Sequence, residues 1–259
     1  MIERFAPPPP EGFARVRMTV AYDGTPFHGF AANNGIRTVQ GDLEAALSTV
    51  MRGPVSVSCA GRTDRGVHAR GQVVSFDVEA ERFDADRLER GLNQMLTPSV
   101  AVRGCEIVSD DFDARLSCKA RSYRYRVLNT AVPDPLLTNL AWHVRGSLDL
   151  APMRLAADRI LGTHDFSGFS KRNKSRPEEN FVRKVTRAEW HRHGDTLQFD
   201  ITARAFTHQM VRSLVGLLVD IGRGRRRAVD MGAALAALDR AAAPSPAPPH
   251  GLVLWQAHY

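Results

Sequence analysis

Residues 55–76 read VSVSCAGRTDRGVHARGQVVSF, and this stretch decides the first part of the fold. Its two ends, Val55–Cys59 and Gly71–Phe76, have the apolar or alternating pattern of β-strands. Between them, Gly61–Ala69 is rich in glycine and charge, which is typical of a loop. The stretch therefore predicts two strands joined by a polar loop that carries one acidic residue, Asp64.

The neighbouring residues predict further strands and helices. A strand upstream is indicated by apolar residues that alternate with polar ones: Val16, Met18, Val20 and Tyr22. A helix capped by Thr38 follows, with apolar residues at helical spacing: Val39, Leu43, Ala46, Leu47 and Val50. Beyond the quoted stretch, a second helix is indicated by Leu88, Leu92, Met95 and Leu96. The first half thus alternates strand and helix.

The second half repeats this order loosely. Tyr123–Leu128 and Leu197–Ala203 alternate as strands. Pro152 suits a first helical turn, ahead of an apolar face with Leu155, Ile160 and Leu161. A last helix is predicted from Met210 to Ile221, ended by Gly222. We therefore predict a mixed α/β (α+β) fold of two similar halves that share a central sheet.

The chain has 259 residues, of which 43% are hydrophobic and 24% charged, so it can bury a substantial core. We divide it into a disordered, proline-rich leader (1–12), an N-terminal catalytic half (13–110) and a C-terminal half (111–259). The longest aliphatic run, near Leu214–Val219, is too short to span a membrane, and no signal pattern begins the chain. The three cysteines are far apart and suggest no disulfide framework. These features predict a soluble protein of the reducing cytoplasm.

Basic residues exceed acidic ones by 7, which favours a polyanionic partner such as nucleic acid. One basic cluster, Lys171, Arg172, Lys174 and Arg176, falls in a polar loop and could contact phosphates. A second, Arg223 with Arg225–Arg227, follows a helix end. Its cations could equally complement the helix dipole.

Asp64 is the strongest candidate for chemistry. Arg62 and Arg65 lie on either side of it, and such cations keep a carboxylate ionised for use as a nucleophile or base. An ordinary turn with a salt bridge explains the same residues. Tyr123 and Tyr125 share one face of their strand, where they could stack on bases or simply pack in the core. No motif for a metal or a nucleotide cofactor is present.

Together these segments resemble the tRNA pseudouridine synthase A (TruA) family from about Val16 to Tyr259. The resemblance rests on six ordered blocks: Tyr22–Gly29 with Thr38–Gly41; Gly61–Ala69; Phe112–Arg115 with Ala120–Tyr125; Gly162–Phe166; Phe206, His208, Met210–Arg212 and Gly216; and Ala247–Leu252.

The resemblance implies a pseudouridine synthase fold, with a central, mostly antiparallel sheet and a basic cleft. It implies a cofactor-independent isomerase (an intramolecular transferase) that binds no metal and works as a cytoplasmic homodimer. The substrate it implies is uridine in the anticodon arm of tRNA, at positions 38 to 40. Asp64 would be the nucleophile, Arg212 its basic partner and Tyr123 a residue that stacks on the extruded base. Arg62 would contact the RNA backbone or fill the gap left by the base, with Lys171, Arg172 and Lys174 on phosphates.

Two departures and two rival functions accompany this hypothesis. The family usually has Trp-Gln where this chain has Phe30-Ala31, and a small residue where Arg65 stands.

A non-catalytic tRNA-binding protein or chaperone on the same fold would keep the basic loops, but it would not need Asp64. A glycoside hydrolase would typically need a second carboxylate, and the Gly61–Ala69 loop contains none.

Overall fold

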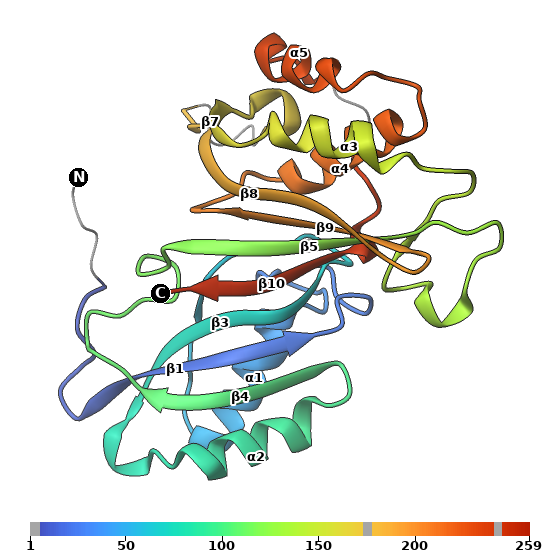
Figure 1. The fold of residues 1–259 in the computed structure, drawn as a ribbon. Coiled ribbons are helices and arrows are strands. Elements are labelled where there is room, and N and C mark those ends of the chain that lie inside the picture. Colours follow the sequence, from blue (N-terminus) through green and yellow to red (C-terminus); the bar gives the residue numbers. More distant parts are fainter. Residues whose placement is uncertain (1–5, 173–177, 241–244) are drawn as a thin grey trace. The chain divides into compact units, whose positions relative to one another are not determined.

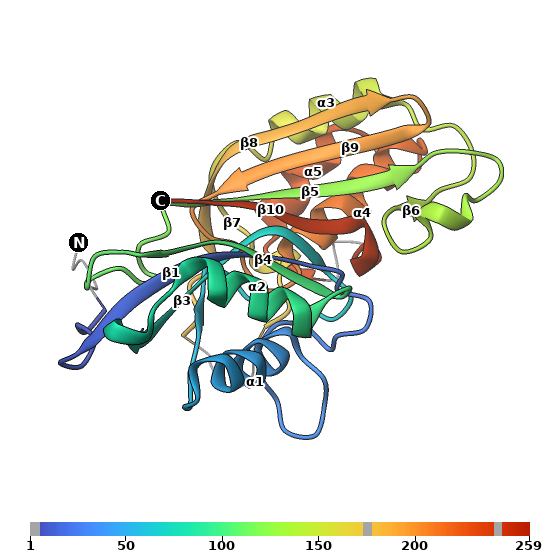
Figure 2. The same cartoon turned by 90° about the horizontal axis from the view of Figure 1, so that it is seen from below.

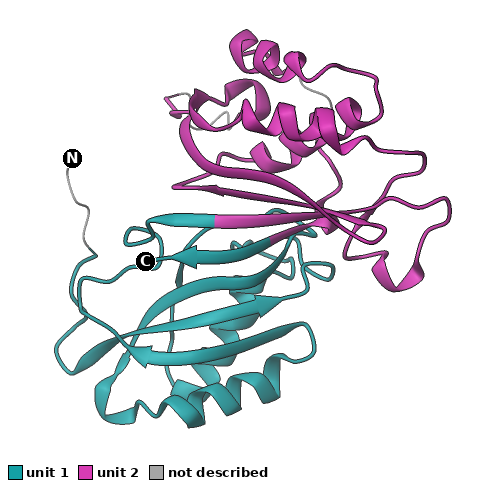
Figure 3. Ribbon diagram, viewed as in Figure 1, with its two compact units in different colours: residues 1–121, 254–259 teal, residues 122–253 magenta. Residues whose placement is uncertain are grey.

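The computed structural model describes residues 6–172, 178–240 and 245–259 (Figure 1). The fold is mixed α/β, as predicted, with a ten-stranded mixed sheet whose main strand order is β4-β1-β3-β10-β5-β9-β8-β7. The chain divides into two compact units, residues 1–121 with 254–259 (unit 1) and residues 122–253 (unit 2) (Figure 3). The units are described separately. The division of function at residues 110 and 111, and the basic cleft, stay predictions.

In unit 1, strand β1 (Phe13–Tyr22) lies antiparallel between β3 (His68–Glu79) and β4 (Val100–Ile107). The last residues of β10 (Leu252–His258) also belong to this unit. The alternation predicted for β1 is confirmed, because Val16, Met18 and Val20 are fully buried.

The strand predicted at Val55–Cys59 is shorter, since only Ser58–Cys59 forms a strand, β2, which pairs with β3. The backbone of residues 55 and 57 instead forms hydrogen bonds with side chains of the first helix. Val55 N–H donates to the Ser48 hydroxyl at 3.2 Å, and Val57 N–H donates to the Glu44 carboxylate at 3.0 Å.

Helices α1 (Val39–Met51) and α2 (Ala85–Leu96) pack together on one face of the unit 1 strands (Figure 2). The predicted cap is confirmed, because the Thr38 hydroxyl accepts from Gly41 N–H at 3.2 Å. In α2, Leu88, Leu92 and Leu96 are buried at a spacing of four residues. Met95, which also marked this helix in the sequence, lies beside that stripe and is 49% exposed.

A small second core covers the other face of β3. It consists of Ala60, Val73, Phe112, Ala114 and Cys118. Strand β3 is therefore buried on both sides from Gln72 to Phe76, which explains why its sequence is a continuous run rather than an alternation. Residues 6–12, the described part of the predicted leader, contact this unit as well, because Arg15 donates to the Pro7 carbonyl at 3.0 Å.

In unit 2, neighbouring strands follow the order β5 (Ala120–Leu128), β9 (Thr196–Ala203), β8 (Val182–His193) and β7 (Gly162–Asp165). The short strand β6 (Trp142–His143) pairs parallel with β5. Helices α3 (Leu150–Asp158) and α4 (Met210–Gly222) pack against each other, and α5 (Val229–Ala237) contacts α3 (Figure 2). Single turns of 3-10 helix complete the described elements, at Ala80–Arg82 in unit 1 and at Pro135–Leu137, Ser167–Phe169 and Pro249–Gly251 in unit 2.

Helix α4 forms the centre of unit 2 and ends at Gly222, as predicted. Eleven of its 13 residues are buried. Gly222 allows α3 to come close, since a Cβ there would lie 2.5 Å from the Met153 sulfur. The helix predicted after Pro152 is present, but it ends at Asp158, before Ile160 and Leu161. Ile160 is buried, whereas Leu155 and Leu161 are 61% and 41% exposed. The buried face is formed by Met153, Ala156 and Ala157.

Within the described residues, no helix combines the length and the apolar character that crossing a membrane requires.

The orientation of α3 can be tested with two truncations in the same helix. Met153→Ala should lower the free energy of unfolding by about 2–5 kcal/mol, because it opens a cavity against α4. Leu155→Ala should change it by no more than about 0.5 kcal/mol, because that side chain is mostly exposed. Urea unfolding followed by circular dichroism measures both. Equal losses would contradict this orientation.

Candidate functional site

The loop that carries Asp64 leaves β2 and returns in β3, and its base is held by the side chain of Gln72. This amide is fully buried in β3. Its nitrogen donates to the Gly61 carbonyl at 2.6 Å, and its oxygen accepts from Gly61 N–H at 3.3 Å. Ala60 N–H also donates to the Val73 carbonyl at 2.8 Å. The first residue of the loop is thus fixed to the sheet on both of its backbone groups.

Thr63, the residue before Asp64, is held by the segment that follows β1. Its hydroxyl shares a buried hydrogen bond of 2.8 Å with the Tyr22 hydroxyl. Its carbonyl accepts from Phe30 N–H at 3.1 Å. The Tyr22 and Phe30 rings pack with their centroids 6.2 Å apart, and both residues are buried. Phe30, where the family usually has tryptophan, therefore serves as a packed ring behind the loop.

Two glycines of the Tyr22–Gly29 block are required by close backbone approach. A Cβ on Gly24 would lie 2.1 Å from the Val67 carbonyl oxygen. A Cβ on Gly29 would lie 2.9 Å from the Thr63 carbonyl oxygen, and Gly29 has a φ of +106° that favours glycine. The opening block of the sequence and the Asp64 loop are therefore one packed unit.

Asp64 itself stands at the start of a turn, where its carbonyl accepts from Val67 N–H at 3.1 Å. The residue is half-buried, between the buried Thr63 and the exposed Arg65. Arg62 is exposed as well. The turn closes through Gly66, whose φ is +75°. The loop thus holds its acid on a rigid backbone, with two cationic side chains at the surface.

His68 and Asp23 fasten the far end of the loop. The His68 ring is buried, and its Nδ1 lies 3.1 Å from the Asp23 carboxylate and 3.0 Å from Gly24 N–H. The carboxylate also accepts from the Thr25 N–H and hydroxyl, at 2.9 and 2.6 Å. Burial raises the pKa of Asp23, but these hydrogen bonds and the His68 ring outweigh it, so the net pKa lies below the usual value.

Arg121 supports the strand that leads into the loop. Its guanidinium is buried and donates twice to the Ala60 carbonyl, at 2.9 and 2.5 Å, and once to the Arg115 carbonyl at 3.0 Å. Cys59 is a neighbour of this group. Burial raises the pKa of the Cys59 thiol to about 11 despite nearby arginines, so at neutral pH it is a neutral packing residue.

In unit 2, Tyr123 lies on the side of β5 opposite Arg124, as the alternation predicted. The tyrosine is buried, and its ring meets Phe206 edge-on at 5.0 Å between centroids. Arg124 forms an ion pair with Asp200 at 2.8 Å. One side of this strand is thus aromatic and the other is charged and paired.

Arg212 lies in the first turn of α4, where buried residues precede and follow it. Only Arg212 and Asp220 in this helix are partly exposed. The Arg212 Nε donates to the Ala247 carbonyl at 2.8 Å, and Ala247 N–H donates back to the Arg212 carbonyl at 2.9 Å. The adjoining Pro248 carbonyl accepts from the Tyr125 hydroxyl at 2.8 Å. The closing segment of the chain therefore fixes Arg212.

The two basic clusters differ in their surroundings. Arg223 and Arg225 approach Asp220 at 3.9 and 3.4 Å, which supports a role at the end of α4. Lys171 and Arg172 are exposed and line a pocket of unit 2. Lys174 and Arg176 lie outside the described residues.

Across the described ranges, no three His, Cys, Asp or Glu side chains are grouped so that they could hold a metal ion.

Comparison with known proteins matches the chain to a family model described as tRNA pseudouridine synthase, over residues 18–116 and 156–259. The chain belongs to this family. A relative from Halalkalibacterium halodurans, named tRNA pseudouridine synthase A, is 44% identical over 92% of this chain and 90% of its own. Relatives with the same name from a Bradyrhizobium species and from Bacillus subtilis are 42% and 38% identical, each over 95% of this chain and 99% of its own.

The matched ranges contain the Asp64 loop with Gln72, Tyr22 and Phe30. They also contain Arg212, Lys171 and Arg172, whereas Arg121 and Tyr123 fall between them. Sequence reasoning singled out the acid but missed Gln72 as its support. The signal for Gln72 was present, because a lone amide inside an apolar strand run must find partners when it is buried.

Gly24→Ala should disrupt this loop, because the added methyl meets the backbone of Val67 rather than a movable side chain. We expect the free energy of unfolding to fall by about 1–3 kcal/mol or more, and the Val67 amide to exchange hydrogen faster. Gly53→Ala is the matched control, since a Cβ there meets nothing within 4 Å. Unchanged exchange at Val67 would show that the loop does not depend on this contact.

Proposed function

We propose that this protein isomerises uridine to pseudouridine in tRNA, with Asp64 as the nucleophile. Membership of the tRNA pseudouridine synthase family supports the reaction. The similarity covers more than nine-tenths of the length of several relatives named tRNA pseudouridine synthase A. The observation that carries the assignment of Asp64 is the construction of its loop. Buried hydrogen bonds from Gln72 and Tyr22 hold the residues before the acid, and the acid itself stays half-exposed.

The reaction exchanges one bond of the uracil for another. Asp64 attacks C1′ of the target ribose as the bond between C1′ and N1 of the base breaks. The uracil then rotates in place, and C5 forms a bond to C1′ that displaces the Asp64 carboxylate. C5 loses a proton and N1 gains one, so the product has the composition of the substrate and no external donor is needed. A carboxylate on a rigid loop suits this step, because its approach to the sugar is set before the substrate binds.

The substrate imposes further requirements. A uridine within an RNA arm must be flipped out, which costs roughly a few kcal/mol of stacking. We assign Tyr123 to stacking on the extruded base, with its ring already oriented by Phe206. We assign Arg62 to the RNA backbone or to the space vacated by the base. Lys171, Arg172 and Lys174 would bind phosphates.

Several finer features follow from the resemblance and stay proposals. The target uridines would be those of the anticodon arm, at positions 38 to 40. The enzyme would act as a homodimer in the cytoplasm. Arg212 would be the basic residue that keeps Asp64 ionised during the reaction.

The nucleophile can be tested with Asp64→Asn, an isosteric change that removes the charge. We expect pseudouridine formation in unmodified tRNA to fall by at least about a thousandfold, while the affinity for tRNA changes little. Chemical mapping of pseudouridine measures the first quantity, and filter binding measures the second. The control is Asp111→Asn, which alters an exposed acid of the same unit.

An Asn variant of undiminished activity would refute the role of Asp64. A wild-type protein that binds tRNA and modifies no uridine would instead favour the non-catalytic RNA-binding alternative. Modification outside the anticodon arm would leave the chemistry standing and correct the substrate position.

The role of Arg212 predicts a loss of rate. In Arg212→Gln pseudouridine formation should fall by about tenfold or more, because the reacting carboxylate loses its cationic partner. Arg145→Gln removes an exposed arginine of the same unit and should leave the rate unchanged. An Arg212→Lys variant that is as slow as Arg212→Gln would assign Arg212 a structural role only.

A further inference from the structure

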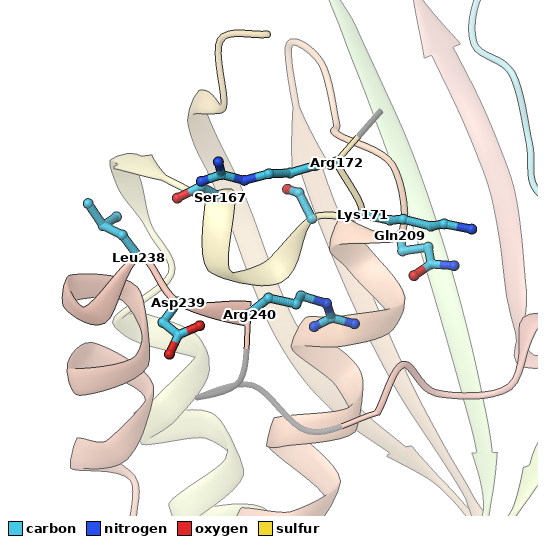
Figure 4. A pocket seen from close by; sticks show the side chains of 8 residues that line it. Ser167, Lys171, Arg172, Gln209, Leu238, Asp239 and Arg240 are labelled. Atoms are coloured by element: carbon cyan, nitrogen blue, oxygen red, sulfur yellow. The ribbon is translucent and has the colours of Figure 1, made fainter. Parts of the chain in front are cut away.

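Unit 2 contains a pocket of about 380 Å³ that Lys171 and Arg172 share with Arg240, a residue not assigned above (Figure 4). Three segments line it: residues 167–172, the residue that precedes α4, and residues 238–240. They are held together by main-chain contacts. Lys171 N–H donates to the His208 carbonyl at 2.9 Å, and a Cβ on Gly168 would lie 3.1 Å from the Asp239 carbonyl oxygen. The pocket is therefore part of the packed fold.

Positive charge dominates the lining. Lys171, Arg172 and Arg240 all contribute, against one acid, Asp239. In Figure 4 the Arg240 guanidinium extends toward Gln209, whereas the Asp239 carboxylate points the other way. The remaining hydrogen-bonding side chains, from Ser167, Ser170 and Gln209, are uncharged. The pocket therefore favours an anion.

One nitrogen of the Arg240 guanidinium, Nη1, is buried and has no hydrogen-bond acceptor among the described residues. Burial lowers the pKa of this partly buried guanidinium. A buried donor without an acceptor is unfavourable, so a bound anion would improve the surroundings of this group.

The backbone around the pocket is strained. Gln209 and Leu238 have φ values of +64° and +53°, in the left-handed region that non-glycine residues rarely adopt. They are two of the three non-glycine residues with positive φ among those described. Such strain costs free energy and is concentrated at binding and catalytic sites. Here it occurs on two walls of one pocket.

We propose that this pocket binds a backbone phosphate of the tRNA, at a subsite centred on Arg240. The volume exceeds that of one phosphate group and accommodates the adjoining ribose, against which the exposed side chain of Leu238 can pack. This proposal rests on the proposed function only for the identity of the ligand, tRNA. Binding at this subsite does not require the chemistry at Asp64.

The experiment measures tRNA affinity against salt concentration, using the full chain and an unmodified tRNA transcript. Arg240→Gln should weaken binding roughly tenfold at physiological salt. It should also reduce the slope of log affinity against log salt by about one, the sign of one lost phosphate contact. Arg240→Lys, which keeps the charge, should retain most of the slope. Arg145→Gln controls for the loss of one exposed positive charge from the unit.

A second variant covers the case in which Arg240→Gln does not fold. Gln209→Gly relieves the strained φ, so the variant should melt at the same temperature as the wild type or higher. If Gln209 has only a structural role, the variant should also keep the affinity for tRNA. If Gln209 contributes to the pocket, the variant should bind tRNA more weakly. Unchanged affinity in this variant would overturn the role of the pocket.

Three further outcomes separate the possibilities. A salt slope in Arg240→Gln equal to that of the wild type would overturn the proposal. So would calorimetric binding of inorganic phosphate that Arg240→Gln abolishes without any change in tRNA affinity, since the pocket would then serve the free ion. If wild-type protein binds tRNA with the expected slope but forms no pseudouridine, the proposed function fails and the subsite stands.

Discussion

The side-chain amide of Gln72 is the interaction on which the candidate site depends. It lies at the centre of a strand that is buried on both faces, where an unpaired amide would be strongly destabilising. Both of its polar atoms are satisfied by the backbone of Gly61. The cost of burying the amide therefore becomes a constraint on the loop, which cannot shift without leaving those atoms unpaired. Asp64 receives its position from this constraint and from Thr63, which Tyr22 and Phe30 hold.

Much of the fold was predictable from local pattern. The alternation in β1, the Thr38 cap and the end of α4 at Gly222 were confirmed, because each depends on short-range geometry. The errors arose where a distant partner decides the outcome. Residues 55–57 resemble a strand, but their backbone forms hydrogen bonds with side chains of α1. In α3, Met153, Ala156 and Ala157 are the buried residues, and Met153 lies beside Gly222 of α4.

The candidate site divides in the same way. Charge and glycine content singled out Asp64 and its loop, and the block Tyr22–Gly29 was recognised as a motif. The reason for its glycines was not visible in the sequence, because Val67 and Thr63 approach them only in the folded chain. The basic loop with Lys171 and Arg172 was singled out, but the pocket that it forms with Arg240 was not visible in the sequence, because three separate segments create it.

Unit 1 is completed by residues 254–259. Within it, Lys119 N–H donates to the His258 carbonyl at 2.8 Å, the Tyr259 hydroxyl donates to the Ala114 carbonyl at 2.7 Å, and the Tyr259 and Phe112 rings pack 5.0 Å apart. Domains usually fold in order of synthesis, beginning with the N-terminal one. Here the unit that carries Asp64 is completed by residues that follow all of unit 2 in the sequence, so unit 1 can finish folding only after unit 2 has been synthesised.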